Sequence, residues 1–290
     1  MQYFLSGITT GSIYAIVAIG FNIIYNTTGI INFAQGEFLM LGGMISISLC
    51  SIMPLPAAIA LAVAITAAVG YLVELLFVRW IKNPTVLRMI IMTIGVSILI
   101  REIALHVWDE KVRSLPYFTG NEVTSMSILG AQISPQILWV LGTCALIVIA
   151  LNLFYGRTLV GKAMRACSAN RVAASLCGIN TKKMITFSFM LSAAIGALAG
   201  CVISPMTQTQ YDSGASLAIK GFTAAIFGGL GSSSGAVVAG LFIGIIEAMS
   251  ISVLPLAYKD AVTLTLLLLI LVVRPSGLFG SREAGALKEF

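Results

Sequence analysis

Apolar runs of about 20 residues recur along this sequence, with short polar connections between them. As helices, runs of that length cross the ~30 Å hydrocarbon core of a membrane. Of the 290 residues, 58% are hydrophobic and 10% are charged, whereas a soluble domain carries roughly a quarter charged residues. We predict an all-α polytopic membrane protein with one transmembrane domain over 1–290 and about 8–9 transmembrane helices, some short or broken near the midplane. The expected spans are 5–25, 37–53, 55–78, 86–105, 136–155, 184–203, 217–230, 235–254 and 259–273.

Basic residues are concentrated in three connections, and this pattern predicts the orientation of the chain. Most of the 17 Lys and Arg fall in 79–88, in 156–183 and in the tail after Leu271. Cytoplasmic connections carry an excess of Lys and Arg, so we expect these three in the cytoplasm. The connections 106–135 and 204–216 are then outside, and nine spans put the N-terminus outside and the C-terminus in the cytoplasm. No basic residue precedes the first apolar run, which favours a retained membrane helix over a secretory signal.

The segment 217–254 is expected to enter the membrane and to return to the outer side. Its first apolar run, 217–230, is too short for an ordinary span. We predict a short helix, a turn in the glycine- and serine-rich stretch Gly228–Gly235, and a longer returning helix. A helix break at membrane depth is tolerated only where the backbone is buried in protein or lines a cavity, so this turn is expected at a functional position.

Several kinds of chemistry find no support in the sequence. The net charge of +6 follows from the basic connections and does not indicate a nucleic-acid partner. The five cysteines are scattered, and the single histidine, His106, is expected in an external connection, so we predict no metal and no cofactor on this chain. The stretch 156–163 begins like a phosphate-binding loop, but Ala163 stands where that motif needs Ser or Thr. We therefore expect a chain that does not bind ATP and is not an enzyme.

The connection 156–183 can form helix over most of its length, with small side chains among its cations. A basic loop that obeys the orientation rule explains the charge but not the small, partly apolar face. An amphipathic helix of this kind suits docking into a groove on a partner. The face is expected around Ala173, Ala174, Leu176 and Ile179.

Three stretches resemble hallmark segments of one transporter family: Gly11–Phe38 (GSIYAIVAIGFNIIYNTTGIINFAQGEF), 161–179 (GKAMRACSANRVAASLCGI) and Gly228–Gly240 (GGLGSSSGAVVAG). Within the second stretch, Arg171–Asn180 resembles the coupling loop of bacterial ABC importer permeases, whose pattern is Glu-Ala-Ala, three residues, then Gly. Val172 stands in the place of the glutamate. Over nearly its whole length the chain is similar to the branched-chain amino-acid permeases, specifically the LivH-like half.

The resemblance implies a multi-pass subunit of the bacterial inner membrane, surrounded by lipid. Its implied partners are a second, related permease subunit in a heterodimer, two cytoplasmic ATPase subunits that hold ATP and magnesium, and a periplasmic solute-binding protein. The implied ATPase-coupling residues are Arg165, Ala166, Arg171, Ala173, Ala174 and Gly178.

The stretch INFAQGEF, residues 31–38, places two amides and a carboxylate at the start of the second predicted span. Charged side chains inside a membrane cost about 2.5–3.5 kcal/mol on insertion scales, so they mark interior or functional positions. Paired glycine-rich breaks in two halves of a transporter indicate its central pathway. We therefore expect the translocation pathway at Asn32, Gln35, Gly36, Glu37, Gly228, Gly229 and Gly231.

A structural interpretation of these polar groups stays open. The two amides could cap a membrane helix, and Glu37 could pair with Lys220 or with an amide. The other acids in the spans are expected in local roles. Glu247 is expected as a packing or subunit-interface carboxylate, and Glu102 as the partner of its neighbour Arg101.

We predict the permease subunit of an ATP-driven importer for branched-chain amino acids, which forms half of the translocation pathway and couples to ATPase subunits. An importer for urea, amides or other small carboxylic solutes is the alternative, because in this family a separate binding protein sets specificity. An ion-coupled secondary transporter would need its own ion site, and few carboxylates cluster in this sequence. A membrane enzyme would need a catalytic constellation, which the sequence does not offer.

Overall fold

The computed structural model describes residues 2–81, 85–121, 124–128, 131–252, 255, 258–274 and 276–279. Over these residues the predicted all-α architecture is confirmed, with one π-helical turn and one two-stranded antiparallel hairpin beside eleven α-helices. The helices are α1 (Gln2–Thr28), α2 (Gln35–Cys50), α3 (Leu55–Val73), α4 (Val86–Trp108), α5 (Gln136–Arg157), α6 (Leu159–Ala169), α7 (Arg171–Leu176), α8 (Thr181–Thr207), α9 (Ser213–Gly228), α10 (Ser233–Ser250) and α11 (Lys259–Val273). The π-helix η1 (Glu74–Val78) continues α3, and the strands are β1 (Met126–Ile128) and β2 (Ala131–Ile133).

Six helices in the described part of the chain are long and apolar enough to cross a membrane: α1, α3 with η1, α4, α5, α8 and α10. Helices α2 and α9 have 16 residues each, and α11 has 15. A 16-residue helix is about 24 Å long, which is shorter than the hydrocarbon core. The chain is therefore a multi-pass membrane protein, while the expected total of about 8–9 transmembrane helices stays a prediction.

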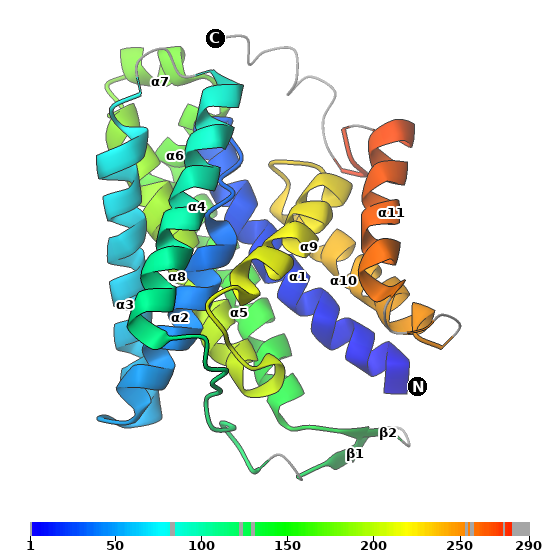
Figure 1. Ribbon diagram of the computed structural model, residues 1–290. Helices are drawn as coiled ribbons and strands as arrows, with labels where there is room; N and C mark the ends of the chain where they lie inside the picture. The colour runs from blue at the N-terminus through cyan, green and yellow to red at the C-terminus, as the bar shows by residue number, and fades with distance from the viewer. Residues whose placement is uncertain are drawn as a thin grey trace.

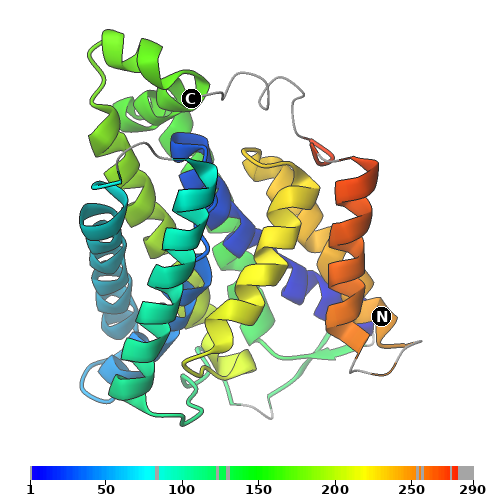
Figure 2. The ribbon, with the colours of Figure 1, turned by 45° about the horizontal axis from the view of Figure 1, so that its top comes forward.

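The helices run between two ends of one bundle (Figure 1). Helices α6 and α7 lie at the same end as the turn between α9 and α10 and the C-terminal end of α11. The hairpin β1–β2 and the N-terminal end of α1 lie at the opposite end, and the connection between α8 and α9 lies there too (Figure 2). The basic connection 156–183 and the mixed connection 106–135 are thus at opposite ends, as the charge pattern predicts.

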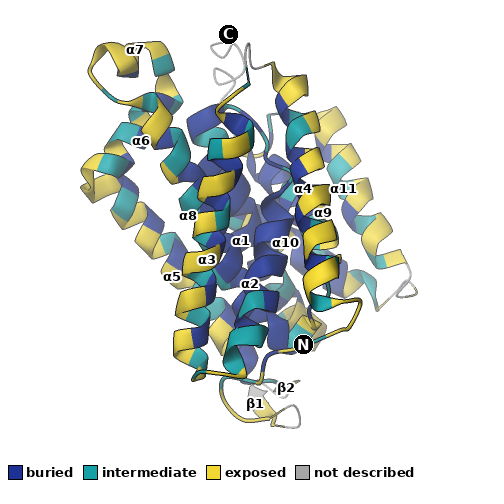
Figure 3. Ribbon diagram, turned by 60° about the vertical axis from the view of Figure 1, so that its left-hand side comes forward, coloured by how far each residue is buried: buried dark blue, intermediate teal, exposed yellow. Residues whose placement is uncertain are grey.

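Helix α1 forms the centre of the bundle and is buried along most of its length (Figure 3). Glycines on α1 and α10 bring the two backbones together, because a Cβ on Gly11 would fall 2.7 Å from the Gly240 carbonyl oxygen. Gly244 packs directly against the backbone of Gly11. Small residues at such crossings let membrane helices gain van der Waals contact. The packing of α1 against α10 therefore depends on glycines at the contact.

The outer helices carry exposed apolar faces (Figure 3). On α4, Ile91, Ile98 and Leu99 are exposed, and Leu146 and Ile149 are exposed on α5. Soluble monomers rarely expose large contiguous apolar surfaces. These faces are the surface that a lipid-embedded protein presents to hydrocarbon.

Residues 213–250 form the helix, turn and returning helix that the sequence predicts. The turn carries Gly229 and Gly231 at φ +94° and +95°, a conformation that glycine adopts without steric cost. Two details differ from the prediction. Helix α9 begins at Ser213, ahead of the apolar run 217–230, because the small residues before that run continue the helix. The turn also lies at the α6 end of the bundle and not near the midplane (Figure 1).

His106 does not lie in an external connection, and that prediction is wrong. Helix α4 continues to Trp108, so His106 is in its last turn, with ring Nδ1 2.8 Å from the Glu102 carbonyl oxygen. The helix is held to this length because the Trp108 indole Nε1–H donates to the Ser48 hydroxyl oxygen, at 2.6 Å. Trp108 thereby anchors the end of α4 to α2.

Candidate functional site

The connection 156–183 forms two helices, α6 and α7, so its predicted helical character is confirmed. Thr158 caps α6, its hydroxyl accepting the Gly161 N–H at 3.0 Å, and Asn170 caps α7, its Oδ1 accepting the Ala173 N–H at 2.9 Å. Side-chain caps of this kind satisfy backbone donors that a helix start leaves free. The cap at Asn170 explains why the segment breaks into two helices instead of one.

The apolar face of α7 differs from the expected one. Ala174 is 4% exposed and packs toward the bundle, so it is not part of an outward surface. Val172 and Leu176 are 70% and 83% exposed, which makes them the apolar side chains that α7 presents to its surroundings. Ala173 is also exposed, and Ala166 is half-buried against the core. A contact of this face with an ATPase subunit stays a prediction.

Arg171 joins α7 to the central helix. Its Nε and Nη2 donate to the Thr27 carbonyl oxygen at 3.1 and 2.9 Å. Thr27 lies in the last turn of α1, where carbonyl oxygens lack partners within the helix and a cation is favourable. Two charge-assisted bonds therefore link the end of α1 to the segment in which coupling residues were expected. The sequence pattern gave no sign of this inward orientation.

Gly178 follows α7 at φ +83°. The space where a Cβ would stand is empty to 4 Å, so the backbone conformation and not crowding accounts for glycine at this position. Arg165, on α6, is exposed with its guanidinium carbon 5.7 Å from the centre of the Tyr155 ring. Their expected contacts with ATPase subunits stay predictions.

The polar residues at the start of α2 lie inside the bundle. Asn32, Gln35 and Glu37 are 0%, 1% and 1% exposed. The Asn32 Oδ1 accepts the Ala34 N–H at 3.1 Å in a local turn before α2, but the N-cap residue of α2 is Ala34 and no side chain caps the helix, so the expected cap is wrong. Gln35 does not cap a helix: its Nε2 donates to the Ser192 carbonyl oxygen at 3.3 Å, and its Oε1 lies 2.6 Å from the Ser192 hydroxyl. Gln35 thereby joins α2 to α8.

Glu37 pairs with α4. Its Oε1 accepts from the Ser97 hydroxyl at 2.8 Å and from Arg101 Nη2 at 3.0 Å. The predicted pairing of Glu37 with Lys220 is wrong, as is the predicted local pair of Arg101 with Glu102, because Arg101 extends across to α2. The carboxylate of Glu37 is buried and needs a cation to offset its desolvation. The carboxylate of Glu102 is exposed and does not need one, so Arg101 pairs with Glu37.

Three polar atoms near this pair have no hydrogen-bond partner in the described part of the chain: Asn32 Nδ2, Glu37 Oε2 and Arg101 Nε. Buried polar atoms without a protein partner are uncommon, and ordered water or a ligand usually satisfies them. This is the feature of the α2 start that favours a functional role. A place for Asn32, Gln35, Gly36 and Glu37 in the translocation pathway stays a prediction.

The two expected pathway elements, the start of α2 and the glycine turn after α9, lie apart. A Cβ on Gly36 would overlap the Gly214 carbonyl oxygen at the start of α9, so α2 and α9 touch there. Gly228, Gly229 and Gly231 lie at the other end of α9, about 20 Å away along the helix. Within this chain, the structure does not bring the two expected pathway elements together.

Two asparagines of α1 hold the turn between α9 and α10. The Asn22 Oδ1 accepts the Gly231 N–H at 3.1 Å, and its Nδ2 donates to the Ser232 carbonyl oxygen at 3.0 Å. Asn26 Nδ2 donates to the Gly231 carbonyl oxygen, also at 3.0 Å. The turn is therefore fixed to α1 by side chains whose positions the glycine pattern alone did not reveal.

Lys220 and Glu247 form a second charge pair, in which Glu247 is buried and Lys220 is half-buried. Lys220 Nζ lies 2.9 Å from Glu247 Oε1 and 2.7 Å from Asp260 Oδ1. The Tyr14 hydroxyl donates to the same Glu247 oxygen at 3.0 Å, and the Thr263 hydroxyl donates to the other, also at 3.0 Å. The pair joins α1, α9, α10 and α11, which confirms the packing role expected for Glu247. The participation of α11 could not be inferred from the sequence.

Comparison with known proteins agrees with these features. A family model described as "Branched-chain amino acid transport system / permease component" matches residues 3–271. The high-affinity branched-chain amino acid transport system permease protein BraD of Pseudomonas aeruginosa is 35% identical, over 98% of this chain and 96% of its own length. The corresponding protein LivH of Escherichia coli is 34% identical over the same shares, and a probable LivH of Methanocaldococcus jannaschii is 28% identical over 93% of this chain and 89% of its own.

Among solved structures, a chain of PsaBC from Streptococcus pneumoniae in complex with Fab has a similar fold. The TM-score is 0.51, with 12% identity over 95% of this chain and 93% of that chain. At this identity the likeness concerns the fold alone. The family match over residues 3–271 and the relatives at 34% and 35% identity along nearly the whole length show that the chain belongs to the family of branched-chain amino acid transport system permease components.

Proposed function

We propose that this chain is the transmembrane permease subunit of an ATP-driven ABC importer for branched-chain amino acids and forms half of the translocation pathway. The observation that carries the proposal is the similarity along nearly the full length to permease proteins of high-affinity branched-chain amino acid transport systems. The many apolar helices agree with a transport role. The chain itself contributes no catalysis, and ATP with magnesium is bound and hydrolysed on partner subunits.

The proposed complex contains this chain, a second related permease subunit, two cytoplasmic ATPase subunits and a periplasmic solute-binding protein. Helices α6 and α7 are the coupling element, and Val172 and Leu176 form the apolar face that docks into an ATPase subunit. The exposure of both side chains supports this, because a helix that docks into a groove on a partner does so with its exposed apolar face. The docking end of the bundle, with the C-terminal end of α11, then faces the cytoplasm.

Arg171 carries the movement of the docking element to the transmembrane core in this proposal. Its two bonds to Thr27 attach α7 to α1, and α1 packs against α10 and holds the turn before it through Asn22. A shift of α6 and α7 is therefore passed to the central helix through hydrogen bonds and close backbone packing. A connected set of rigid contacts is what such coupling needs.

The polar cluster of Glu37, Ser97 and Arg101 belongs to the part of the chain that rearranges during transport. Its unpartnered atoms support this, since they have hydrogen-bonding capacity that the described conformation does not use. A related importer for urea, amides or other small carboxylic solutes is the second candidate function. The polar cluster suits that class as well, because its donors and acceptors match amide and carboxylate groups.

Reconstitution tests the proposal. The purified complex, with its binding protein, is placed in liposomes, and uptake of leucine, isoleucine and valine is compared with uptake of urea and acetamide. We expect ATP-dependent uptake of the three aliphatic amino acids that vanadate abolishes. Uptake driven by a proton or sodium gradient without ATP would refute the ABC assignment, and uptake of urea or acetamide alone would refute the substrate class.

A further inference from the structure

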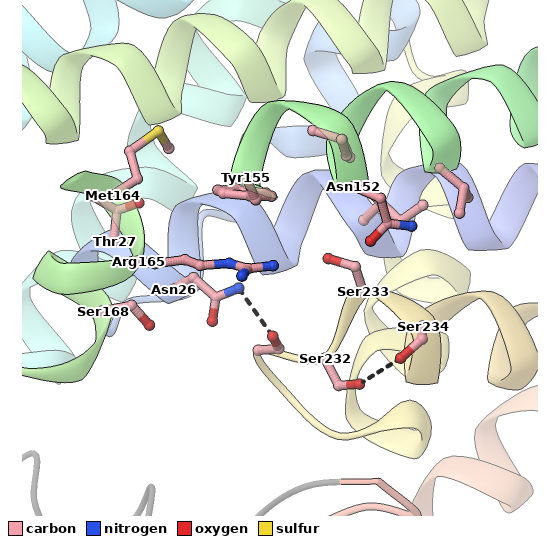
Figure 4. Close-up of a pocket in the computed structure, with 14 residues that line it drawn as sticks. Asn26, Thr27, Asn152, Tyr155, Met164, Arg165, Ser168, Ser232, Ser233 and Ser234 are labelled. Carbon is pink, nitrogen blue, oxygen red and sulfur yellow. Dashed lines mark hydrogen bonds between the residues drawn. The ribbon is translucent and has the colours of Figure 1, made fainter. Parts of the chain in front are cut away.

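A cavity of about 330 Å³ opens at the α6 end of the bundle (Figure 4). Its walls come from four places in the sequence: the last turns of α1, the second half of α5, helix α6 and the start of α10. The volume falls at the lower end of the range for small-molecule sites, which suits a ligand of amino-acid size. Arg165 and Gly231, an expected coupling residue and an expected pathway residue, line it, but Val172, Leu176 and the polar cluster at Glu37 lie outside it.

The polar lining carries one charge, and that charge is positive. Arg165 is the only charged residue among those that line the cavity in the described part of the chain, and its contact there is with the Tyr155 ring. Figure 4 shows its guanidinium directed into the space between α6, α5 and the start of α10, with the Asn152 amide and the Ser233 hydroxyl facing the same space. A cation without a carboxylate partner in such a space favours an anionic ligand.

Several further polar groups around the cavity have unused hydrogen-bonding capacity. Among the described residues, the side chains of Asn152, Ser168 and Ser233 form no hydrogen bond. The Tyr155 side chain is 9% exposed and its hydroxyl has no partner. The 18-residue helix α10 adds the positive end of its dipole, because its N-cap residue Ser232 lines the cavity. The buried Tyr155 hydroxyl without a partner, the adjacent Arg165 guanidinium and a helix start on the same space indicate a binding site.

Part of the lining is apolar. Ile19, Val148 and Leu151 form an apolar wall, and Met164 lies beside them. One guanidinium matches a monoanion better than a phosphate dianion, and the aliphatic wall matches a branched hydrocarbon chain. Among the described residues of the lining there is no carboxylate, so neutral oxygens such as those of Asn152 and Ser233 would hold an ammonium group on the ligand.

From this combination we propose that the cavity binds a small aliphatic monocarboxylate, with the released branched-chain amino acid as its occupant, and that binding slows further import. This inference rests on the proposed function for the identity of the product. The walls belong to the coupling helix α6, the central helix α1 and the start of α10. A ligand that contacts all three stabilises their present arrangement and opposes the rearrangement that transport requires.

A binding experiment on the complete complex without its binding protein tests the site. Equilibrium binding of radiolabelled leucine in phosphatidylcholine nanodiscs is compared for the parent, Asn152→Leu, Ser233→Ala and the matched control Leu153→Met. Leu153 is the exposed neighbour of Asn152 and does not line the cavity. Loss of one hydrogen bond to a charged ligand corresponds to about tenfold or more in affinity. We expect that weakening for the two cavity variants and none for Leu153→Met.

Competitors define the ligand chemistry in the same assay. We expect unlabelled leucine and its 2-oxo analogue, 4-methyl-2-oxopentanoate, to displace the label, and inorganic phosphate or added phosphatidylglycerol to leave it bound. Displacement by phosphate or by the anionic lipid would overturn the proposed ligand. Direct binding of radiolabelled 4-methyl-2-oxopentanoate without binding of radiolabelled leucine would refute the assignment of the product, and equal affinity in all four proteins would refute the site.

Regulation is tested in liposomes by the ratio of uptake rates with and without leucine on the ATPase side. We expect the ratio to fall below one for the parent and for Leu153→Met, and to return toward one for Asn152→Leu. A complex that imports leucine, yet shows a ratio of one in the parent, would overturn the inference and leave the proposed function standing. A complex that imports no leucine but binds it in the cavity would refute the proposed function and keep the site.

Discussion

Glu37 and Arg101 form an ion pair between α2 and α4, with Arg101 Nη2 3.0 Å from Glu37 Oε1. The carboxylate side chain is 1% exposed, whereas the guanidinium side chain is 29% exposed and reaches the edge of the bundle. The two partners are therefore unequal. Glu37 is fully buried and depends on Arg101 for its charge to be tolerated, while Arg101 is partly exposed.

This inequality predicts the effect of breaking the pair. We expect Arg101→Ala to destabilise the protein by about 3 kcal/mol, because it leaves a buried carboxylate without its cation. The double variant Glu37→Gln/Arg101→Ala should recover most of that loss, since no buried charge remains. Melting of the purified complex, followed by size-exclusion chromatography after heating, measures both. Glu102→Gln, the exposed neighbour, is the control. Equal losses in the single and double variants would show that the charge is not the cause.

The hydrogen bonds between Arg171 and Thr27 predict that a variant without them will hydrolyse ATP with little transport. Arg171→Gln removes charge-assisted bonds worth about 1.5–3 kcal/mol and frees α7 from α1. We expect the ATPase subunits to bind and hydrolyse ATP while leucine uptake per ATP falls by about tenfold. Lys162→Gln removes an exposed cation from α6 and should leave that ratio unchanged. An unchanged ratio in Arg171→Gln would exclude this link as the route of coupling.

Docking of α7 on an ATPase subunit predicts a second phenotype, in which the ATPase subunits no longer bind the permease. Burying a leucine side chain contributes about 2 kcal/mol, or roughly thirtyfold in affinity, and an aspartate at an apolar contact adds a desolvation cost. We therefore expect Leu176→Asp to release the ATPase subunits during purification, while the permease stays in the membrane. Leu176→Met keeps an apolar side chain and should retain them. Full retention of the ATPases by Leu176→Asp would place the docking surface elsewhere.

The positions of the helices could be predicted to a large extent from local sequence. Apolar runs of membrane-spanning length located the long helices, and glycines with positive φ accounted for the turn between α9 and α10. The end of α4 was missed because Trp108 is held by a hydrogen bond to Ser48, a contact between residues far apart in the chain. Local patterns contain no information on such anchors.

The partners of the buried charges could not be predicted for a related reason. Lys220 was a plausible partner for Glu37 by composition, but the fold places Lys220 beside Glu247 and Asp260, and it places Arg101 beside Glu37. A single sequence holds several cations that fit each acid equally well. The choice is made by helix packing, which depends on glycine contacts such as Gly36 with α9. The cavity was missed because its lining comes from four separate segments.

Cys177 offers a test of the orientation with a native side chain. It is exposed after α7, whereas Cys167 on α6 is 3% exposed and burial raises the pKa of its thiol, which lowers its reactivity. Cys50, half-buried at the end of α2, is changed to Ser to leave Cys177 as the exposed thiol of the described cysteines. We expect a membrane-impermeant maleimide to label Cys177 in inside-out vesicles and not in intact cells, and bound ATPase subunits to slow that labelling. Labelling in intact cells would place α6 and α7 outside and contradict both the orientation and the docking role.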